Sequence, residues 1–325
     1  MARGGGRGGR NPKDLPRKQQ VSRKVSWLLR HGANQEGLKL GKGGYVGVHE
    51  ALNTRSLTQL KVSFAELRDV VKTNDKQRFS MVLKERLEKV SEEEAKKAAA
   101  EEASAEGEEE EDPSKWMIRA NQGHSIKVDT EGLLTPISVE KGNVPDVVVH
   151  GTDEHAWNLI LKSGGLRRMG RNHIHFASGL PAGFKALDEP ASAGEPEKEA
   201  PPVISGMRKS AIVLVYVDIQ AAMQAGIKFF VSENEVILTE GNEQGFLPYE
   251  FFKRVENRKK SGDVLMSGGV LPKGVVVDVE AWEKEVGTKG GESGRGRGGR
   301  GGRGGRDGGG KARVNDDSGD VVAGI

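Results

Sequence analysis

Two stretches of the sequence concentrate side chains that could contact a charged substrate. Arg119–Ser125 (RANQGHS) gathers hydrogen-bond donors around a glycine, which is typical either of a phosphate-contacting loop or of a polar turn. In Arg171–His175 (RNHIH), the period of a strand places Arg171, His173 and His175 on one face. Two histidines at this spacing are also found in zinc sites, but no acidic motif nearby completes a set of metal ligands.

Three further candidates each have an ordinary structural explanation as well. Arg30 and His31 end a stretch with helical spacing, where cations complement the helix dipole and the following Gly32 fits the position after the last turn. Arg78 opens a strand-like stretch, where it is by itself a surface arginine. The segment His150-Gly-Thr152 follows an apolar run: a tight glycine turn there could offer backbone groups to a ligand, or Thr152 could cap the next helix.

The elements that would position the first candidates read as three helices followed by a hairpin. Apolar residues recur at helical spacing over Val21–Ala33, and a short helix fits Val48–Asn53. Ser63-Phe-Ala-Glu66 has the pattern of a capping box at the start of a third helix. Arg78–Leu83 and Trp116–Asn121 resemble two strands. This order is that of a winged helix, a common nucleic-acid-binding module.

The second folded region mixes strands with short helices. Strands are predicted over Val147–His150, Asn172–Ala177, Ala211–Ile219, Ile227–Val231, Val236–Thr239 and Val275–Val279, with a helix over Asp153–Lys162. An α+β fold is therefore expected, and a doubly wound nucleotide-binding sheet is disfavoured. Neither a G-x-G-x-x-G after a strand nor a G-x-x-x-x-G-K-[ST] occurs, so neither common phosphate loop is available.

The remaining segments have compositions that oppose folding. Residues 1–10 and 294–306 alternate arginine with glycine, which suits either a solubilising tail or contact with nucleic acid that is not sequence-specific. Ser91–Asp112 holds eleven acidic residues against two lysines and reads as a solvated insertion, begun as a helix continued from Leu83–Val90.

Composition also excludes several classes of protein. The 325 residues include no cysteine, which excludes disulfides, thiolate zinc sites and cysteine nucleophiles. No run of 18 apolar residues and no secretory signal is evident, so we expect no membrane partner and a nuclear or cytoplasmic, not secreted, protein.

In combination, the motifs resemble those of the NAD-dependent tRNA 2′-phosphotransferase family. The stretches that carry the resemblance appear in the family's order and span most of the folded part of the chain: Ser26–Ala33, Gly43–Val46, Asn74–Phe79, Ile118–Ser125, Val149–Thr152, Gly165–Leu166, Met169–His175 and Ser232–Thr239. The acidic insertion and the Arg/Gly-rich tails depart from the family's core but interrupt none of these motifs.

The resemblance implies an architecture and a set of site residues. It implies a winged-helix RNA-binding lobe over 18–130 and an NAD-binding lobe of ADP-ribosyltransferase type over 131–286. The acidic insertion at 91–112 and disordered tails over 1–17 and 287–325 are expected from composition instead. The family's essential Arg-His-Arg-Arg set corresponds to Arg30, His31, Arg78 and Arg171. Cofactor contacts are expected at His150, Gly151, Thr152, His173, His175 and, as a ribose contact, Asn234; phosphate or RNA contacts are expected at Arg119, Gln122, His124 and Ser125.

The activity implied is transfer of an internal 2′-phosphate from spliced tRNA to NAD, used as a co-substrate without a metal. The products would be RNA with a 2′-hydroxyl, nicotinamide and ADP-ribose 1″,2″-cyclic phosphate. Whether His31 acts as an acid or only binds phosphate is left open. The alternatives are a non-catalytic RNA-binding protein, an ADP-ribosyltransferase with another phosphate or protein as acceptor, and a metal-dependent phosphatase that uses His173 and His175.

Overall fold

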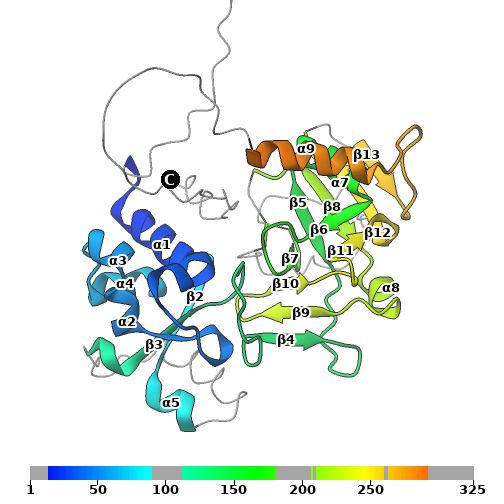
Figure 1. The fold of residues 1–325 in the computed structure, drawn as a ribbon. Coiled ribbons are helices and arrows are strands. Elements are labelled where there is room, and N and C mark those ends of the chain that lie inside the picture. The colour runs from blue at the N-terminus through cyan, green and yellow to red at the C-terminus, as the bar shows by residue number, and fades with distance from the viewer. Residues whose placement is uncertain (1–13, 90–111, 181–205, 208–209, 260–262, 292–325) are drawn as a thin grey trace, which may run out of the picture.

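The computed structural model describes residues 14–89, 112–180, 206–207, 210–259 and 263–291. Two groups of elements lie side by side, one built on a three-stranded sheet and one on an eight-stranded sheet (Figure 1). The structure agrees with the predicted α+β class, since it combines helices with several sheets whose strands pair antiparallel. The Arg/Gly-rich stretches and nearly all of the acidic insertion fall outside the described residues.

The N-terminal group packs helices against a small sheet of order β1-β3-β2. Its strands are β1 (Val46–Gly47), β2 (Phe79–Leu83) and β3 (Trp116–Ala120), and β3 pairs antiparallel with both neighbours. Its α-helices are α1 (Arg17–Trp27), α2 (Val48–Leu52), α3 (Arg55–Gln59), α4 (Phe64–Lys72) and α5 (Lys84–Lys89), and short 3₁₀ turns cover Asn34–Glu36, Lys42–Gly44 and Pro113–Lys115. Val21, Leu28, Leu67 and Ile118 are fully buried in its hydrophobic core.

Local sequence signals account for much of this group. The Ser63 hydroxyl accepts from the Glu66 amide at 3.1 Å, and the Glu66 carboxylate accepts from the Ser63 amide, so the predicted capping box is confirmed. The predicted hairpin of β2 and β3 is also confirmed, with Phe79 opposite Ala120 and Leu83 opposite Trp116. Strand β1 and helix α3 were not predicted, because two and five residues carry too little periodicity to be recognised.

The end of the first helix differs from expectation. The chain continues from α1 into a π-helical turn over Leu28–Gly32, and the left-handed residue that ends the following 3₁₀ turn is Gly37. Gly32 is not in the left-handed region; instead, a Cβ atom there would lie 2.6 Å from the Trp27 ring. The predicted role of Gly32 as the helix stop is therefore wrong, and glycine is needed for the close approach of an indole. Wide π turns of this kind often occur at functional sites.

The C-terminal group is centred on an antiparallel sheet of order β13-β12-β8-β5-β7-β10-β9-β4. The sheet strands are β4 (Leu134–Ile137), β5 (Val149–Thr152), β7 (Ile174–Ala177), β8 (Val213–Val217), β9 (Phe229–Ser232), β10 (Val236–Thr239), β12 (Phe252–Asn257) and β13 (Asp263–Ser267). A two-stranded sheet pairs β6 (Gly165–Arg167) with β11 (Phe246–Pro248). Helices α7 (Glu154–Ser163), α8 (Ile219–Gln224) and α9 (Val279–Gly291), and a 3₁₀ turn at Tyr249–Phe251, complete the group.

Two predictions for this group need correction. Val275–Val279 forms no strand: residues 275–278 are irregular, Val279 begins α9, and Val276 is exposed. The glycine of His150-Gly-Thr152 does not make a turn after a strand, because all three residues lie within β5 and pair with β8. The side chain that caps α7 is Asp153, whose carboxylate accepts from the Ala156 amide at 2.8 Å, and not Thr152.

Within the described ranges, no helix has the length and apolarity required to cross a bilayer.

The contact between Trp27 and Gly32 predicts that the effect of Gly32→Ala on stability changes sign when the indole is removed. Gly32→Ala should lower the free energy of unfolding by about 1–3 kcal/mol, because the new methyl group displaces the indole. In a Trp27→Ala background the same substitution should raise stability by up to about 1 kcal/mol, since alanine is the better helix former. Urea unfolding of the four proteins measures both effects. Equal destabilisation in both backgrounds would show that the indole is not the obstacle.

Candidate active site

The segment that follows β3 connects the predicted functional stretches. The Asn121 amide donates to the Arg78 carbonyl at 2.9 Å, and the Ser125 amide donates to the Arg30 carbonyl at 3.0 Å. The His124 carbonyl accepts from the Asn172 amide at 2.9 Å. Three stretches far apart in sequence are thus attached to residues 121–125, which pass between the two sheets.

Arg30 and His31 are held against this segment by the π-helical turn. Arg30 is 1% exposed, and a Cβ added to Gly123 would lie 3.4 Å from its guanidinium carbon. Gly123 has φ +90°, so both backbone conformation and space favour glycine here. The His31 Nδ1 atom lies 2.8 Å from the Ser125 hydroxyl, which orients the imidazole. The predicted residues Arg30, His31 and Ser125 are therefore neighbours in space.

Arg78 is fixed by contacts on both sides of its backbone. It is 3% exposed, and Asn74 Oδ1 accepts from its amide and from Nη1, each at 3.3 Å. Its carbonyl accepts from Asn121, whose Nδ2 donates to the Gln77 carbonyl at 2.9 Å. Asn74 and Asn121 were not predicted as site residues, although both lie in the stretches that carry the family resemblance.

Arg171 belongs to the same region but is less enclosed. It is half-buried, and it precedes Asn172, whose Nδ2 donates to the Ile126 carbonyl at 2.8 Å. Two bonds from Asn172 to the 124–126 segment therefore attach the Arg171 backbone to the N-terminal group. Arg171 thus reaches the region from the larger sheet, whereas Arg30 and Arg78 reach it from the smaller one.

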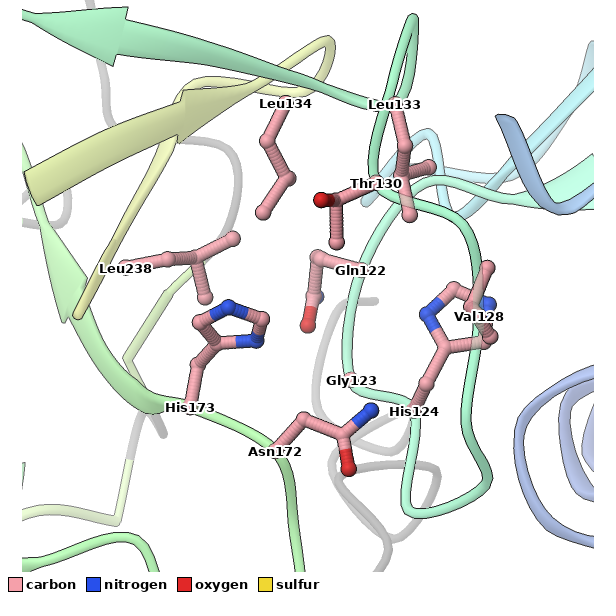
Figure 2. A pocket seen from close by; sticks show the side chains of 10 residues that line it. All are labelled: Gln122, Gly123, His124, Val128, Thr130, Leu133, Leu134, Asn172, His173 and Leu238. Atoms are coloured by element: carbon pink, nitrogen blue, oxygen red, sulfur yellow. The ribbon is translucent and has the colours of Figure 1, made fainter. Parts of the chain in front are cut away.

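A pocket beside residues 121–125 combines amide and imidazole groups with an apolar wall. Figure 2 shows Gln122, Asn172 and His173 around its centre, with Leu238 beside His173 and with Leu133 and Leu134 on the side away from Asn172. Val128, Thr130, Gly123 and His124 complete the lining. The atoms Gln122 Oε1 and His124 Nε2 are fully buried and make no hydrogen bond to the described residues. Buried polar atoms of this kind fit a polar ligand or an ordered water.

The histidines of this pocket are neutral at ordinary pH. Burial lowers the pKa of His124 to about 3, and electrostatic interaction with Arg30, Arg119 and the imidazoles of His31 and His173 acts in the same direction. Burial also lowers the pKa of His173, although Glu240, 3.8 Å from Nε2, opposes the shift. Each neutral imidazole can therefore donate one hydrogen bond and accept another without adding positive charge to the pocket.

The predicted cofactor residues lie on adjacent strands. The His175 carbonyl lies 2.9 Å from His150 Nδ1, and because a carbonyl only accepts, the proton of a neutral His150 resides on Nδ1. Gly151 has no room for a side chain, since a Cβ atom would overlap Met207. Ile174 and Phe176 point into the core, and His175 lies on the opposite face of β7, as the alternation predicted. The strand begins at Ile174, so Arg171 and His173 precede it and the predicted strand face does not extend to them. No set of three side chains suited to a metal ion occurs among the residues that the structure describes.

Two residues predicted to contact a ligand, Arg119 and Asn234, have partners within the protein. Arg119 donates to the carbonyls of Gly43 and Gly132 and to Glu233 Oε2, the last at 2.7 Å, and lies 4.6 Å from the Tyr45 ring centre. The Asn234 amide bonds to the Lys76 carbonyl and to the Ser232 hydroxyl. These contacts assign Arg119 and Asn234 to the joint between the sheets, because most of their polar atoms are already engaged there.

The low pKa of His124 predicts a pH-dependent contribution to stability. The unfolded histidine binds a proton below its ordinary pKa of 6.5, whereas the folded one does so only near 3. Stability should therefore fall as pH decreases from 6.5 toward 3, with up to about 1.4 kcal/mol per pH unit from this residue. In His124→Gln the slope of unfolding free energy against pH should be smaller over this window. An unchanged slope would show that His124 is protonated in the fold.

The sequence is similar to proteins of known family over most of its length. The model of the family described as "RNA 2'-phosphotransferase, Tpt1 / KptA family" matches residues 16–241. The chain is 37% identical over 258 residues to tRNA 2'-phosphotransferase 1 of Danio rerio, covering 79% of this chain and 94% of that protein. It is 37% identical over 250 residues to tRNA 2'-phosphotransferase 1 of Homo sapiens, covering 76% and 79% respectively.

A more distant relative has the same activity in its name. The tRNA 2'-phosphotransferase of Saccharomyces cerevisiae is 30% identical over 239 residues, covering 73% of this chain and 82% of that protein. The matched part includes the π-helical turn, Arg78, the segment 121–125 and both central strands β5 and β7. The chain therefore belongs to the RNA 2′-phosphotransferase family and is a transferase.

Proposed function

We propose that this protein removes the internal 2′-phosphate left at the splice junction of ligated tRNA by transferring it to NAD. The observation that carries the proposal is the attachment of the Arg30, Arg78 and Asn172 backbones to one five-residue segment. This arrangement anchors the backbone of three stretches that carry arginines, from both sheets, to one segment of the chain. In the overall reaction the phosphate leaves the RNA, nicotinamide is released, and the products are RNA with a 2′-hydroxyl and ADP-ribose 1″,2″-cyclic phosphate.

Three arginines supply the positive charge that binding of the transferred phosphate requires. A 2′-phosphate is close to a dianion, and arginine forks bind its oxygens through paired, charge-assisted hydrogen bonds. Arg30 and Arg78 are 1% and 3% exposed, so their fields are screened less by solvent than those of surface arginines. Arg171 would add a third fork from the larger sheet. Together they would bind the phosphate and stabilise charge as it is transferred.

His31 has a separate role in the proposal. Its Nδ1 is next to the Ser125 hydroxyl, which sets the direction of the ring and leaves Nε2 as the atom on the opposite edge. A ring so oriented can donate a hydrogen bond to a phosphate oxygen or supply a proton to it. Ser125 is thus proposed to act through His31.

His150, Gly151 and Thr152 would hold the nicotinamide end of NAD, and His173 or His175 the ribose or pyrophosphate. The unbonded buried atoms of Gln122 and His124 favour a polar ligand nearby. NAD supplies its own leaving group, so the residues need to bind, align and exclude water rather than provide a strong base. We also propose that the N-terminal group is a winged helix that binds the RNA and that the C-terminal group is an ADP-ribosyltransferase-like lobe.

A direct assay tests the reaction. Full-length protein should release the phosphate from an RNA oligonucleotide with one internal 2′-phosphate only when NAD is present, with ADP-ribose cyclic phosphate as co-product, and EDTA should not inhibit. Loss of phosphate without NAD and with EDTA sensitivity would favour a histidine metal site. RNA binding without turnover would favour a non-catalytic RNA-binding protein.

Removal of one buried cation should affect chemistry more than folding. Arg78→Ala should lower turnover by roughly 100- to 1000-fold, as loss of a preorganised donor does in other enzymes. Arg78→Lys should have a turnover between those of Arg78→Ala and wild type, because lysine keeps the charge but lacks the planar fork of the guanidinium group. Arg55→Ala, which removes an exposed arginine of α3, is the matched control and should turn over like wild type. Near-normal turnover of Arg78→Ala would return Arg78 to a structural role.

A further inference from the structure

The turn between β9 and β10 connects the two sheets. It contains Glu233 and Asn234 and belongs to the eight-stranded sheet, yet both side chains reach the N-terminal group. Asn234, 4% exposed, donates from Nδ2 to the Lys76 carbonyl at 2.9 Å. Glu233 Oε2 accepts from Arg119 Nη2 at 2.7 Å and lies 2.8 Å from the Ser80 hydroxyl.

The turn presets the direction of the Asn234 amide. The Ser232 hydroxyl lies 2.9 Å from Asn234 Oδ1 and accepts from the Val236 amide at 3.1 Å. The amide oxygen is thereby directed toward Ser232 and the NH₂ group toward Lys76. Glu235 has φ 59°, which closes the turn in the left-handed region at some cost to a residue other than glycine. A strained, internally bonded turn of this kind is a rigid support.

The two contacts bracket Arg78. Lys76 lies two residues before it and Ser80 two residues after it, and Gln77 between them has φ 43°. From its own sheet Arg78 is held by Asn74 and Asn121. The turn adds a second set of restraints from the other sheet. The Ser80 hydroxyl lies within hydrogen-bond distance of Glu233 Oε2 and of Asn121 Oδ1, the latter at 2.6 Å, and its single proton can be donated to either. Ser80 therefore connects the restraints from the turn with those from the N-terminal group.

We infer that Glu233 and Asn234 are positioning residues for Arg78: they hold the start of β2, which Arg78 directly precedes, against the sheet that carries the residues proposed to bind NAD. The inference rests on the proposed function. It follows because two of the three arginines proposed to bind the RNA phosphate, Arg30 and Arg78, belong to the N-terminal group, whereas the residues proposed to bind NAD lie on or beside the eight-stranded sheet. An error of about 1 Å between reacting groups can cost roughly 100-fold in rate. Asn234 then acts through Arg78 and not as the ribose contact predicted from the resemblance.

The test measures kcat and KM for NAD in Asn234→Ala and Asn234→Asp, in the wild-type chain and in Arg78→Lys. Asn234→Asp keeps the size and the oxygen facing Ser232 but replaces the donor to Lys76 with a carboxylate oxygen. Both variants should lower kcat by roughly 10- to 100-fold with KM for NAD within about twofold. In the Arg78→Lys background, the same Asn234 substitutions should lower kcat by only about threefold or less. The reason is that the flexible ammonium group of lysine has no planar fork whose orientation the turn could fix.

Asn242→Ala is the matched control. Asn242 Oδ1 accepts from the Gln244 and Phe246 amides in another turn of the C-terminal group, so its loss weakens a turn without touching Lys76. It should leave kcat unchanged, and thermal unfolding of all variants reports any general loss of structure. A raised KM for NAD with unchanged kcat, or an equal loss of kcat in both Arg78 backgrounds, would overturn the inference. Absence of NAD-dependent phosphate release by the unmodified protein would instead overturn the proposed function.

Discussion

Burial of arginine is the constraint on which the rest of the structure depends. A guanidinium group keeps its charge in the protein interior, so a buried arginine has to be supplied with acceptors. Arg30, Arg78 and Arg119 are each 3% exposed or less. Arg119 shows how the demand is met: two carbonyls, the Glu233 carboxylate and the Tyr45 ring surround it, and they come from both sides of the joint. Because its partners belong to different sheets, satisfying this charge also fixes the two sheets relative to each other.

The joint explains why the cations proposed to bind phosphate can come from separate elements. Arg30 lies on a π-helical turn, Arg78 precedes β2, and Arg171 precedes β7. The backbone of residues 121–125 supplies a bond to the first two stretches directly and to the third through Asn172. Backbone bonds of this kind are short and directional, so they place side chains more closely than flexible surface ion pairs would. Neutral His124 and His173 occupy the space beside these cations without adding to their repulsion.

Glycines mark the points where this arrangement is tightest. Gly32 admits the Trp27 ring against the turn that carries Arg30 and His31, and Gly123 admits the Arg30 guanidinium against the central segment. Gly151 admits Met207 beside the strand proposed to hold the nicotinamide end. Each of these glycines lies in a stretch with which the family was recognised. The physical reason is close approach of another group, and only for Gly123 is it also a backbone conformation that other residues avoid.

The sequence by itself determined the family, the α+β class, the hairpin that follows Arg78, the capping box at Ser63 and the alternation of Ile174, His175 and Phe176 in β7. These depend on spacing, caps and local periodicity, which are properties of short stretches of chain. Only the tertiary structure decided that Gly32 makes room for an indole, that Thr152 lies inside a strand, and that Arg119 and Asn234 join the sheets. It also decided that Asn74 and Asn121 hydrogen-bond to Arg78 and that Glu233 accepts from Arg119. The reason is that a polar side chain has several possible partners of equal chemistry, and which one it meets depends on segments as far apart in sequence as Ser80 and Glu233.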